Sequence, residues 1–302
     1  MSNPDASAAA AVFGPMRLPF LTLVPACVLL GAAVARLHTG SLGITHFLLV
    51  LLGGLAAHIG VNALNEYDDF KSGLDLKTTR TPFSGGSGTL PAQPQRSRYA
   101  LFTGLLSLLV VLLVGVYFVF QWGWTIAPLG LLGVLTIVSY TPAMTRSPLL
   151  CLLAPGLGFG IFMVNGAYFA LTGRYSWAAL LVSLVPFFLV SNLLLINQFP
   201  DLEADRAAGR RHLIITHGRT AGLRAYVLFL AVCYLSIPAA VLLVGLPAWT
   251  LLGLLTLPLG LRVSRGLAAH KEDIPALIPY LGQNVLLTLA TPLLMALGIF
   301  LG

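Results

Sequence analysis

The chain has 302 residues, of which 57% are hydrophobic and 9% are charged, and its net charge is +7. A soluble domain carries charge on about a quarter of its residues, so this composition excludes an ordinary water-soluble protein. Apolar runs of about 20 residues are long enough to cross a bilayer as helices. The composition therefore predicts a protein that spans a membrane several times.

Nine apolar runs are candidate spans, and the fourth and eighth are short. They cover residues 17–38, 43–64, 99–120, 123–141, 147–172, 177–199, 222–243, 246–262 and 274–301. We therefore predict an all-α integral membrane protein with nine transmembrane helices in a single domain, 1–302. Residues 1–16 lack the basic stretch that opens a cleaved signal peptide, so we expect them to form a flexible cytoplasmic tail.

Lysine and arginine residues are distributed unevenly between the two sides of this bundle. Fifteen of the seventeen lie on the side that holds the N-terminus and the loops after spans 2, 4, 6 and 8, and the exceptions are Arg36 and Arg174. Positive charge marks the cytoplasmic side of a membrane protein. We therefore expect these loops and the N-terminus on the cytoplasmic face of the inner membrane. The net charge then reflects topology and an anion site, and it does not indicate nucleic-acid binding.

Acidic residues are concentrated in two of the cytoplasmic segments, 65–98 and 200–221. Four of the ten acidic residues lie in NEYDDFKSGLD (65–75), and a second group lies in NQFPDLEADRAAGRRHL (197–213). Both motifs begin with Asn-x-x-x-Asp, and four predicted helices separate them. This repeat predicts two similar four-helix halves followed by a ninth helix.

Residues four positions apart lie on the same face of a helix. The spacing therefore places Asn65 beside Asp69, and it places Asn197, Asp201 and Asp205 in one row. Both rows would lie at the cytoplasmic ends of their spans, where they can face a common site.

Two residues affect how far these helices continue. Gly73 favours the end of a helix, which would turn Asp75 back toward Asp69. Pro200 predicts either a bend in the sixth span or the end of its regular part. If that helix continues, Glu203 points away from the row of aspartates.

Carboxylates that crowd together at a membrane boundary repel one another unless a cation neutralises them. Hard oxygen ligands suit Mg²⁺, which also binds the phosphates of substrates. The expected metal ligands, whose four aspartates are also the expected catalytic residues, are Asn65, Asp69, Asp75, Asn197, Asp201 and Asp205. The basic side chains expected to bind a diphosphate beside them are Lys71, Lys77, Arg80 and Arg210. The alternative is that all these residues are solvated loop charges beside the membrane.

At these motifs the chain resembles the UbiA superfamily of intramembrane prenyltransferases, over nearly its whole length. That family has nine helices with aspartate-rich motifs after helices 2 and 6. The longer spacing to Asp75, the second motif and GAYFALTGRYSW (166–177) resemble the branch that prenylates 1,4-dihydroxy-2-naphthoate in menaquinone synthesis. Arg17 matches a basic residue at the start of the family's first helix, and Tyr140 opens the family's YTP motif. The resemblance therefore adds Arg17 to the diphosphate site and makes Tyr140 a candidate for the active site, the alternative being that Tyr140 anchors the protein at the membrane interface.

The chain departs from the family pattern in four places. Glu66 stands where the first motif usually has Asp, and His212 stands where this branch usually has Thr. Phe159 occupies a position in APGLGFG (154–160) where an acid is expected. The loop FSGGSGTL (83–90) is also richer in glycine and serine than the family's loop.

The resemblance implies Mg²⁺-dependent transfer of an isoprenyl group, inside the bilayer, from an isoprenyl diphosphate to a hydroxy-aromatic acceptor such as 1,4-dihydroxy-2-naphthoate. No redox cofactor is implied. One alternative is an enzyme on the same scaffold that cyclises its isoprenyl diphosphate without an acceptor. Another is a transporter, which is disfavoured because transporter sites usually lie near the bilayer midplane and the acids here lie at the cytoplasmic edge.

Several polar residues lie inside or next to the spans. Asn165 and Asn192 are expected either to line the acceptor or cation pocket with Tyr140, or to hydrogen-bond neighbouring helices. His58 is expected to be a buried hydrogen-bonding side chain. His212 and the nearby His217 are expected to be solvated in a basic loop.

Overall fold

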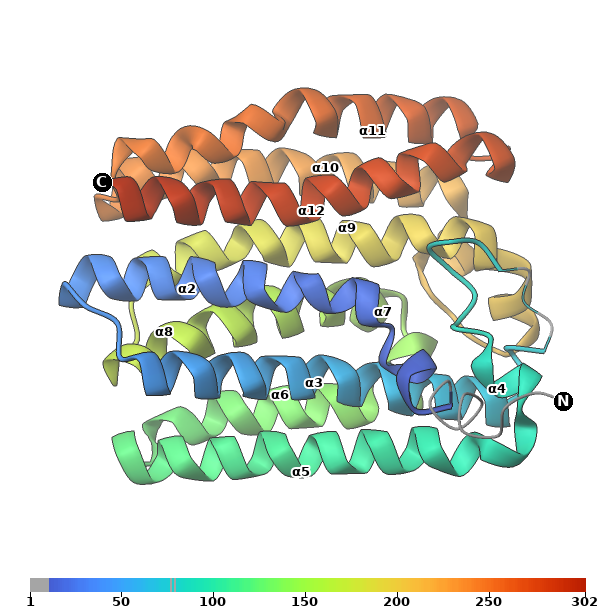
Figure 1. Cartoon of the computed structure of the whole chain (residues 1–302). Helices are drawn as coiled ribbons and strands as arrows, with labels where there is room; N and C mark the ends of the chain where they lie inside the picture. The colour runs from blue at the N-terminus through green and yellow to red at the C-terminus, as the bar shows by residue number, and fades with distance from the viewer. Residues whose placement is uncertain (1–10, 77, 79) are drawn as a thin grey trace, which may run out of the picture.

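Long helices lie side by side and gather their ends at two opposite faces (Figure 1). The structure is a computed structural model that describes residues 11–76, 78 and 80–302. Its elements are η1 (Leu18–Thr22), α2 (Leu23–Thr39), α3 (Ile44–Lys71), α4 (Thr89–Ala92), η2 (Pro94–Arg96), α5 (Ser97–Trp122), η3 (Trp124–Ile126), α6 (Ala127–Ser139), η4 (Met144–Arg146), α7 (Pro148–Gly156), η5 (Leu157–Val164), α8 (Asn165–Thr172), α9 (Trp177–Ala207), α10 (Leu213–Val244), η6 (Ala248–Thr256), α11 (Leu257–His270) and α12 (Ile274–Leu301).

Eight helical segments in the described part of the chain are long and apolar enough to cross a membrane. They are Ala11–Thr39, Ile44–Lys71, Pro94–Trp122, Pro148–Thr172, Trp177–Ala207, Leu213–Val244, Ala248–His270 and Ile274–Leu301. The predicted span 123–141 corresponds to a shorter apolar helix, Trp124–Ser139. The predicted all-helical, multi-pass membrane protein is therefore confirmed, whereas the count of nine spans and the two similar halves stay predictions.

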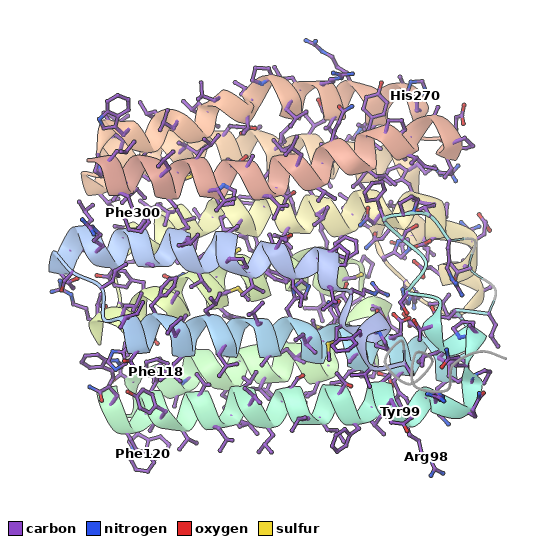
Figure 2. All side chains as sticks on the ribbon, viewed as in Figure 1. Arg98, Tyr99, Phe118, Phe120, His270 and Phe300 are labelled. Carbon is purple, nitrogen blue, oxygen red and sulfur yellow. The ribbon has the colours of Figure 1, made fainter. Side chains whose placement is uncertain are left out.

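The outer surface of the bundle carries large apolar side chains, as a lipid-facing surface requires. Phe120 points outward from α5 and is 88% exposed (Figure 2). Tryptophans are found where α5 ends, where α9 begins and where η6 begins, at the face that also holds the C-terminus (Figure 1). Aromatic residues of this kind are enriched at membrane interfaces. The opposite face carries both acidic motifs, at the ends of α3 and α9 (Figure 1).

The centre of the bundle is formed by α9 and α2, beside α10 and α12 (Figure 1). In the most apolar stretch of each span, 67% of residues are buried for α9 and 61% for α2, against 28% for α3 and for α5. Small residues allow this close packing, because a Cβ at Gly31 of α2 would lie 2.5 Å from the Val164 carbonyl oxygen. The second acidic motif is therefore carried by the most enclosed helix.

The two predicted active-site loops are partly helical. The helix α3 continues to Lys71, and α9 continues through Pro200 to Ala207, so the expectation that Pro200 could end the regular helix is wrong. A proline inside a helix removes one backbone hydrogen bond, and burial of the flanking Phe199 and Leu202 holds the helix together here. The connection after α9 is consequently short, from Ala208 to His212.

The segment with the Gly-rich sequence APGLGFG changes its helical geometry. It passes from α7 into η5, a π-helical stretch, a geometry that is frequent at functional sites. A Cβ at Gly156 or Gly160 would lie 2.2 Å or 2.4 Å from backbone atoms of Phe187 in α9. Glycine at both positions lets the two helices pack closely, and the π-helical stretch carries Phe159 to the functional site.

Candidate active site

The first acidic motif forms a polar row at the end of α3. The amide of Asn65 donates to the Asp69 carboxylate at 3.0 Å and to the Thr141 hydroxyl at 3.1 Å. Asp69 is 6% exposed, and both residues line one cavity of about 160 Å³. The contact to Thr141 fixes the side chains of α3 against the segment that follows α6.

The second motif forms the facing row on α9. Asn197, Asp201 and Asp205 are successive helical neighbours, and all three line the same cavity, which we call the acid cavity. Glu203 points outward, with a 76% exposed side chain that pairs with Arg206 at 3.0 Å. The helical spacing therefore separates the acids that share the cavity from the one that does not.

Each helix ends with a glycine that turns the chain back toward the cavity. Gly73 and Gly209 have φ of 77° and 78°, a backbone conformation that favours glycine. The amide of Leu74 then donates to the Asp69 carbonyl at 3.0 Å, and the amide of Arg210 donates to the Asp205 carbonyl at 3.0 Å. These turns bring Asp75 and Arg210 to the site.

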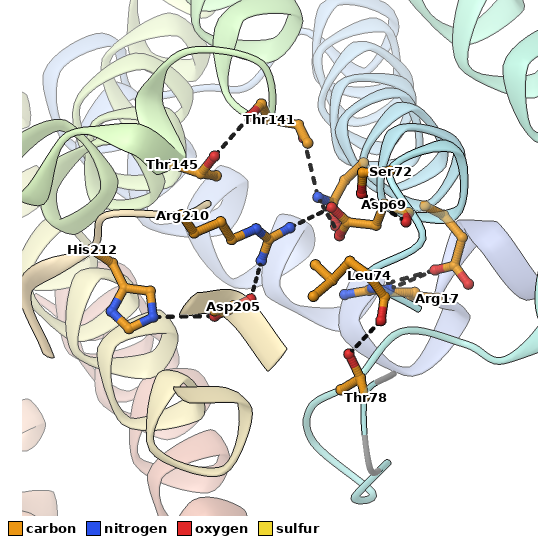
Figure 3. Close-up of polar contacts among 12 residues, drawn as sticks. Arg17, Asp69, Ser72, Leu74, Thr78, Thr141, Thr145, Asp205, Arg210 and His212 are labelled. Atoms are coloured by element: carbon orange, nitrogen blue, oxygen red, sulfur yellow. Dashed lines mark hydrogen bonds and ion pairs between the residues drawn. The ribbon is translucent and has the colours of Figure 1, made fainter. Parts of the chain in front are cut away.

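The guanidinium of Arg210 lies between the two rows and contacts both (Figure 3). It donates to Asp205 at 2.9 Å and, at closer range, to Asp69. Burial lowers the pKa of Arg210, but the two carboxylates more than offset this and raise it above its usual value. Arg210 therefore remains charged and joins motifs that are far apart in the sequence.

Several oxygen atoms around the acid cavity have no hydrogen-bond partner among the described residues. They are Oδ2 of Asp75, Oδ1 of Asn197, Oε1 of Gln198 and Oδ1 of Asp201, and all four residues line the cavity. Such carboxylate and amide oxygens are the ligands that Mg²⁺ prefers. Within the described residues, no three His, Cys, Asp or Glu side chains lie close enough to form a complete metal site. The donor set thus fits a magnesium ion that keeps waters or phosphate oxygens as further ligands.

Asp75 is enclosed by the glycine-rich loop. A Cβ at Gly86, whose φ is 73°, would lie 3.0 Å from Oδ1 of Asp75. Burial, followed by the negative charges of the neighbouring Glu66 and Asp69, raises the pKa of Asp75 to about 7 against the opposing effect of Arg17 and Arg210. This carboxyl group can therefore change its charge near neutral pH.

Glu66 holds three segments together and is itself fully buried. Its carboxylate accepts hydrogen bonds from Arg17 at 3.2 Å and from the Ser87 amide at 2.8 Å. Ser87 belongs to the glycine-rich loop, and Arg17 precedes η1 and lines the acid cavity. The acid that departs from the family motif thus anchors the loop and Arg17.

His212 is buried, and the expectation that it is solvated is wrong. It is 1% exposed, lines the acid cavity and contacts Asp205 at 3.1 Å. The basic loop sequence gave no sign of this, because burial follows from the short connection between α9 and α10. His217, in contrast, is exposed, as expected.

The other predicted site residues are divided between the cavity and other surroundings. Tyr140 lines the acid cavity. Arg80 lines a neighbouring cavity of about 490 Å³ that shares Arg17 with the first. Lys71 is exposed and lies 5.7 Å from the centre of the Tyr67 ring. Lys77 lies outside the described residues.

The two asparagines predicted for the pocket are located elsewhere. Asn165 donates to the Ser183 hydroxyl at 3.1 Å, and Asn192 donates to the Tyr226 carbonyl at 2.9 Å. Both are buried between helices and do not line the acid cavity. The second of the two expected roles, hydrogen bonding between helices, is the one the structure shows, because amides inside a span need partners.

Asn62 was not identified as a cavity residue from the sequence, and His58 was expected to be a buried hydrogen-bonding side chain. His58 and Asn62 continue the row of Asn65 and Asp69 along α3, at helical spacing that the sequence does contain. His58 is buried, packs edge-on against Phe159 at 4.7 Å between ring centres, and has no partner for Nδ1 among the described residues. Their spacing alone could have identified them.

A membrane-embedded helical bundle with two facing aspartate rows and arginines around one cavity has the architecture of an intramembrane prenyltransferase. The chain belongs to the UbiA prenyltransferase family, which matches residues 23–280. It is therefore a prenyltransferase, and the resemblance seen in its motifs is confirmed.

Curated relatives are about a quarter identical to the chain over the aligned residues. It is 26% identical over 257 residues to a 1,4-dihydroxy-2-naphthoate octaprenyltransferase of Bacillus subtilis, covering 83% of this chain and 80% of the relative. It is 24% identical over 266 residues to a 2-carboxy-1,4-naphthoquinone phytyltransferase of Synechocystis, covering 84% and 81%.

Solved structures share the fold at lower identity. A UbiA homologue from Aeropyrum pernix has a TM-score of 0.66 at 17% identity, covering 94% of this chain and 98% of that one. A UbiA homologue from Archaeoglobus fulgidus, solved with GPP and Mg²⁺, has a TM-score of 0.59 at 14% identity, covering 98% and 100%.

Proposed function

We propose that this prenyltransferase transfers an isoprenyl group from an isoprenyl diphosphate to a naphthalene-type acceptor, with Mg²⁺ as its cofactor. The observation that carries the proposal is the meeting of two acid rows, from α3 and α9, around a single cavity with unpartnered oxygens. The resemblance to a homologue solved with GPP and Mg²⁺ supports the same assignment.

The residues that would hold Mg²⁺ belong to both rows. From the α3 side they are Asn65, Asp69 and Asp75, and from the α9 side they are Asn197, Asp201 and Asp205. The metal would neutralise negative charge on the diphosphate as it leaves. The proposal keeps the four aspartates as the residues on which turnover depends.

Two arginines that line the acid cavity would bind the diphosphate oxygens. Arg17 is oriented by Glu66, and Arg210 is oriented by Asp69 and Asp205. Preorganised cations stabilise charge that develops on a leaving group. Lys71 and Arg80 lie outside this cavity, so we propose that they attract the anionic donor as it approaches the site.

The acid cavity also has apolar lining residues. Phe20, Leu23, Phe159, Leu193 and Leu194 line it. These side chains would surround the first carbons of the isoprenyl chain and exclude water from the electron-poor allylic carbon. The Tyr140 hydroxyl, which lines the same cavity, would hydrogen-bond the acceptor.

The names of the curated relatives support the choice of acceptor. The relatives from Bacillus subtilis and Haemophilus influenzae are named for 1,4-dihydroxy-2-naphthoate, and the one from Synechocystis for 2-carboxy-1,4-naphthoquinone. All are bicyclic rings with two oxygens and a carboxyl group. We therefore propose a quinone precursor of this kind, and a role in menaquinone-type biosynthesis.

We also propose that the acid cavity opens toward the cytoplasm. In the topology predicted from the sequence, fifteen of the seventeen basic residues are on the side of the acidic motifs, and positive charge favours the cytoplasmic side. The N-terminus would then be cytoplasmic and the protein would reside in the inner membrane.

A product assay tests the proposal. Purified protein in lipid nanodiscs is incubated with Mg²⁺, isoprenyl diphosphates of several lengths and a panel of naphthoates and hydroxybenzoates, and products are identified by mass. We expect a prenylated naphthoate that disappears when EDTA is added. Conversion of the diphosphate to a cyclic hydrocarbon without acceptor would establish the cyclase alternative, and turnover in EDTA would contradict the role of the metal.

A further inference from the structure

His212 occupies the junction between α9 and α10. It is the last residue of the short connection and the N-cap of α10, with a backbone in the extended region. Its ring is buried at 1% exposure. A buried imidazole needs partners for both nitrogens, and the structure supplies one for each.

The hydrogen bonds of the ring determine where its proton resides. Nδ1 accepts from the Ile215 backbone amide at 3.4 Å, in the manner of a helix cap. Nδ1 therefore carries no hydrogen, and the ring is the neutral tautomer with its hydrogen on Nε2. Nε2 lies 3.1 Å from Oδ2 of Asp205, so it donates to that oxygen.

This contact completes the support of the Asp205 carboxylate. The other oxygen, Oδ1, accepts from Arg210 at 2.9 Å, and Asp205 is 3% exposed. With one donor on each oxygen, the carboxylate cannot rotate freely. Each oxygen still has a second lone pair that a metal could use.

We propose that His212 is a positioning residue that holds Asp205 in the orientation needed to bind Mg²⁺. The inference rests on the proposed function, because it takes Asp205 as a metal ligand. The imidazole has two separate roles: Nδ1 caps α10 and stabilises the fold, and Nε2 orients the carboxylate. Removing a hydrogen-bond partner of a metal ligand typically weakens metal affinity about 10–100-fold.

Two substitutions separate these roles, because each amide replaces one ring nitrogen. In His212→Asn the side-chain oxygen lies near the position of Nδ1, and asparagine is a strong N-cap, but the side chain cannot reach Asp205. In His212→Gln the amide nitrogen lies near the position of Nε2 and can donate to Asp205, while glutamine caps poorly.

The measurements are the dissociation constant of Mg²⁺ alone, by titration calorimetry on the full chain in nanodiscs, and the melting temperature. The Mg²⁺ concentration for half-maximal transfer serves as the second measure of affinity. For His212→Asn we expect affinity to fall about 10–100-fold with a melting temperature within roughly 2 °C of the parent protein. For His212→Gln we expect an affinity within about threefold of the parent, and a melting temperature lowered by roughly 2–4 °C.

The inference is overturned if His212→Gln loses Mg²⁺ affinity while His212→Asn keeps it. If His212→Asn binds Mg²⁺ as tightly as the parent protein, His212 is simply a helix cap. The same conclusion follows if the loss of Mg²⁺ affinity in the two variants is proportional to their loss of melting temperature. Absence of prenyl transfer by the parent protein would contradict the proposed function instead, and the two metal affinities would still decide the role of His212.

Discussion

Replacing Asp69 by asparagine removes one of the two carboxylates that contact Arg210 and keeps nearly the same side-chain volume. Asp69 is 6% exposed, accepts from Asn65 at 3.0 Å and pairs with Arg210. Loss of one strong contact to the transition state lowers turnover by about 10²–10³-fold. We therefore expect Asp69→Asn to lower kcat by about a hundredfold or more.

The expected effect on stability is smaller. Arg210 keeps its contact with Asp205 at 2.9 Å, so its charge is not left alone in the protein. A hydrogen bond to a charged group contributes about 1.5–3 kcal/mol, and a loss within this range leaves the bundle folded. The melting temperature therefore shows whether the variant is intact before turnover is compared.

The assay is prenyl transfer in nanodiscs at several Mg²⁺ concentrations, with Glu203→Gln as the matched control. Glu203 lies on α9 between Asp201 and Asp205, but its side chain is 76% exposed and pairs with Arg206 at the surface. Such a surface ion pair contributes about 0–1 kcal/mol, so this variant should retain turnover. Near-normal turnover of Asp69→Asn at low Mg²⁺ would refute the reasoning and leave the acids as loop charge.

Three further predictions follow from other residues. Because the pKa of Asp75 is raised to about 7, its protonated form stabilises the fold at low pH, and this contribution is lost as the pH rises through about 7. Without divalent cations, the melting temperature of Asp75→Asn should therefore depend less on pH between about 5 and 8 than that of the parent protein. The same pH profile in both proteins would contradict this. Asn192→Ala removes the hydrogen bond to the Tyr226 carbonyl and should lower the free energy of unfolding by about 1–3 kcal/mol without changing the KM for the donor. A raised KM would indicate that Asn192 contacts the substrate. Single cysteines at the exposed Ser41 and His217 should be labelled from outside intact cells at residue 41 but not at residue 217, and the reverse pattern would invert the proposed orientation.

The sequence by itself determined the spans and the rows of polar residues. Hydrophobic runs report burial in lipid whatever their neighbours are, so the apolar segments followed from the chain alone. The continuation of α9 through Pro200 to Ala207 did not, because the sequence left open that the proline ends the regular helix. The four-residue spacing from Asn65 to Asp69, and from Asn197 to Asp205, likewise follows from helix geometry. Such local patterns also allowed the turn at Gly73 that brings Asp75 back.

Only the tertiary structure decided which charged and polar groups meet. Arg210 contacts Asp69 across 141 positions of the chain, and Glu66 contacts Arg17 and Ser87 from different segments. Charged loop sequences predict solvation, so the burial of His212 against Asp205 could not be read from them. Asn165 and Asn192 lie on spans next to the site, yet the rotation of each helix directs them to other helices. Contacts between helices depend on how the whole bundle packs, and a periodicity within one helix carries no information about which helix it will face.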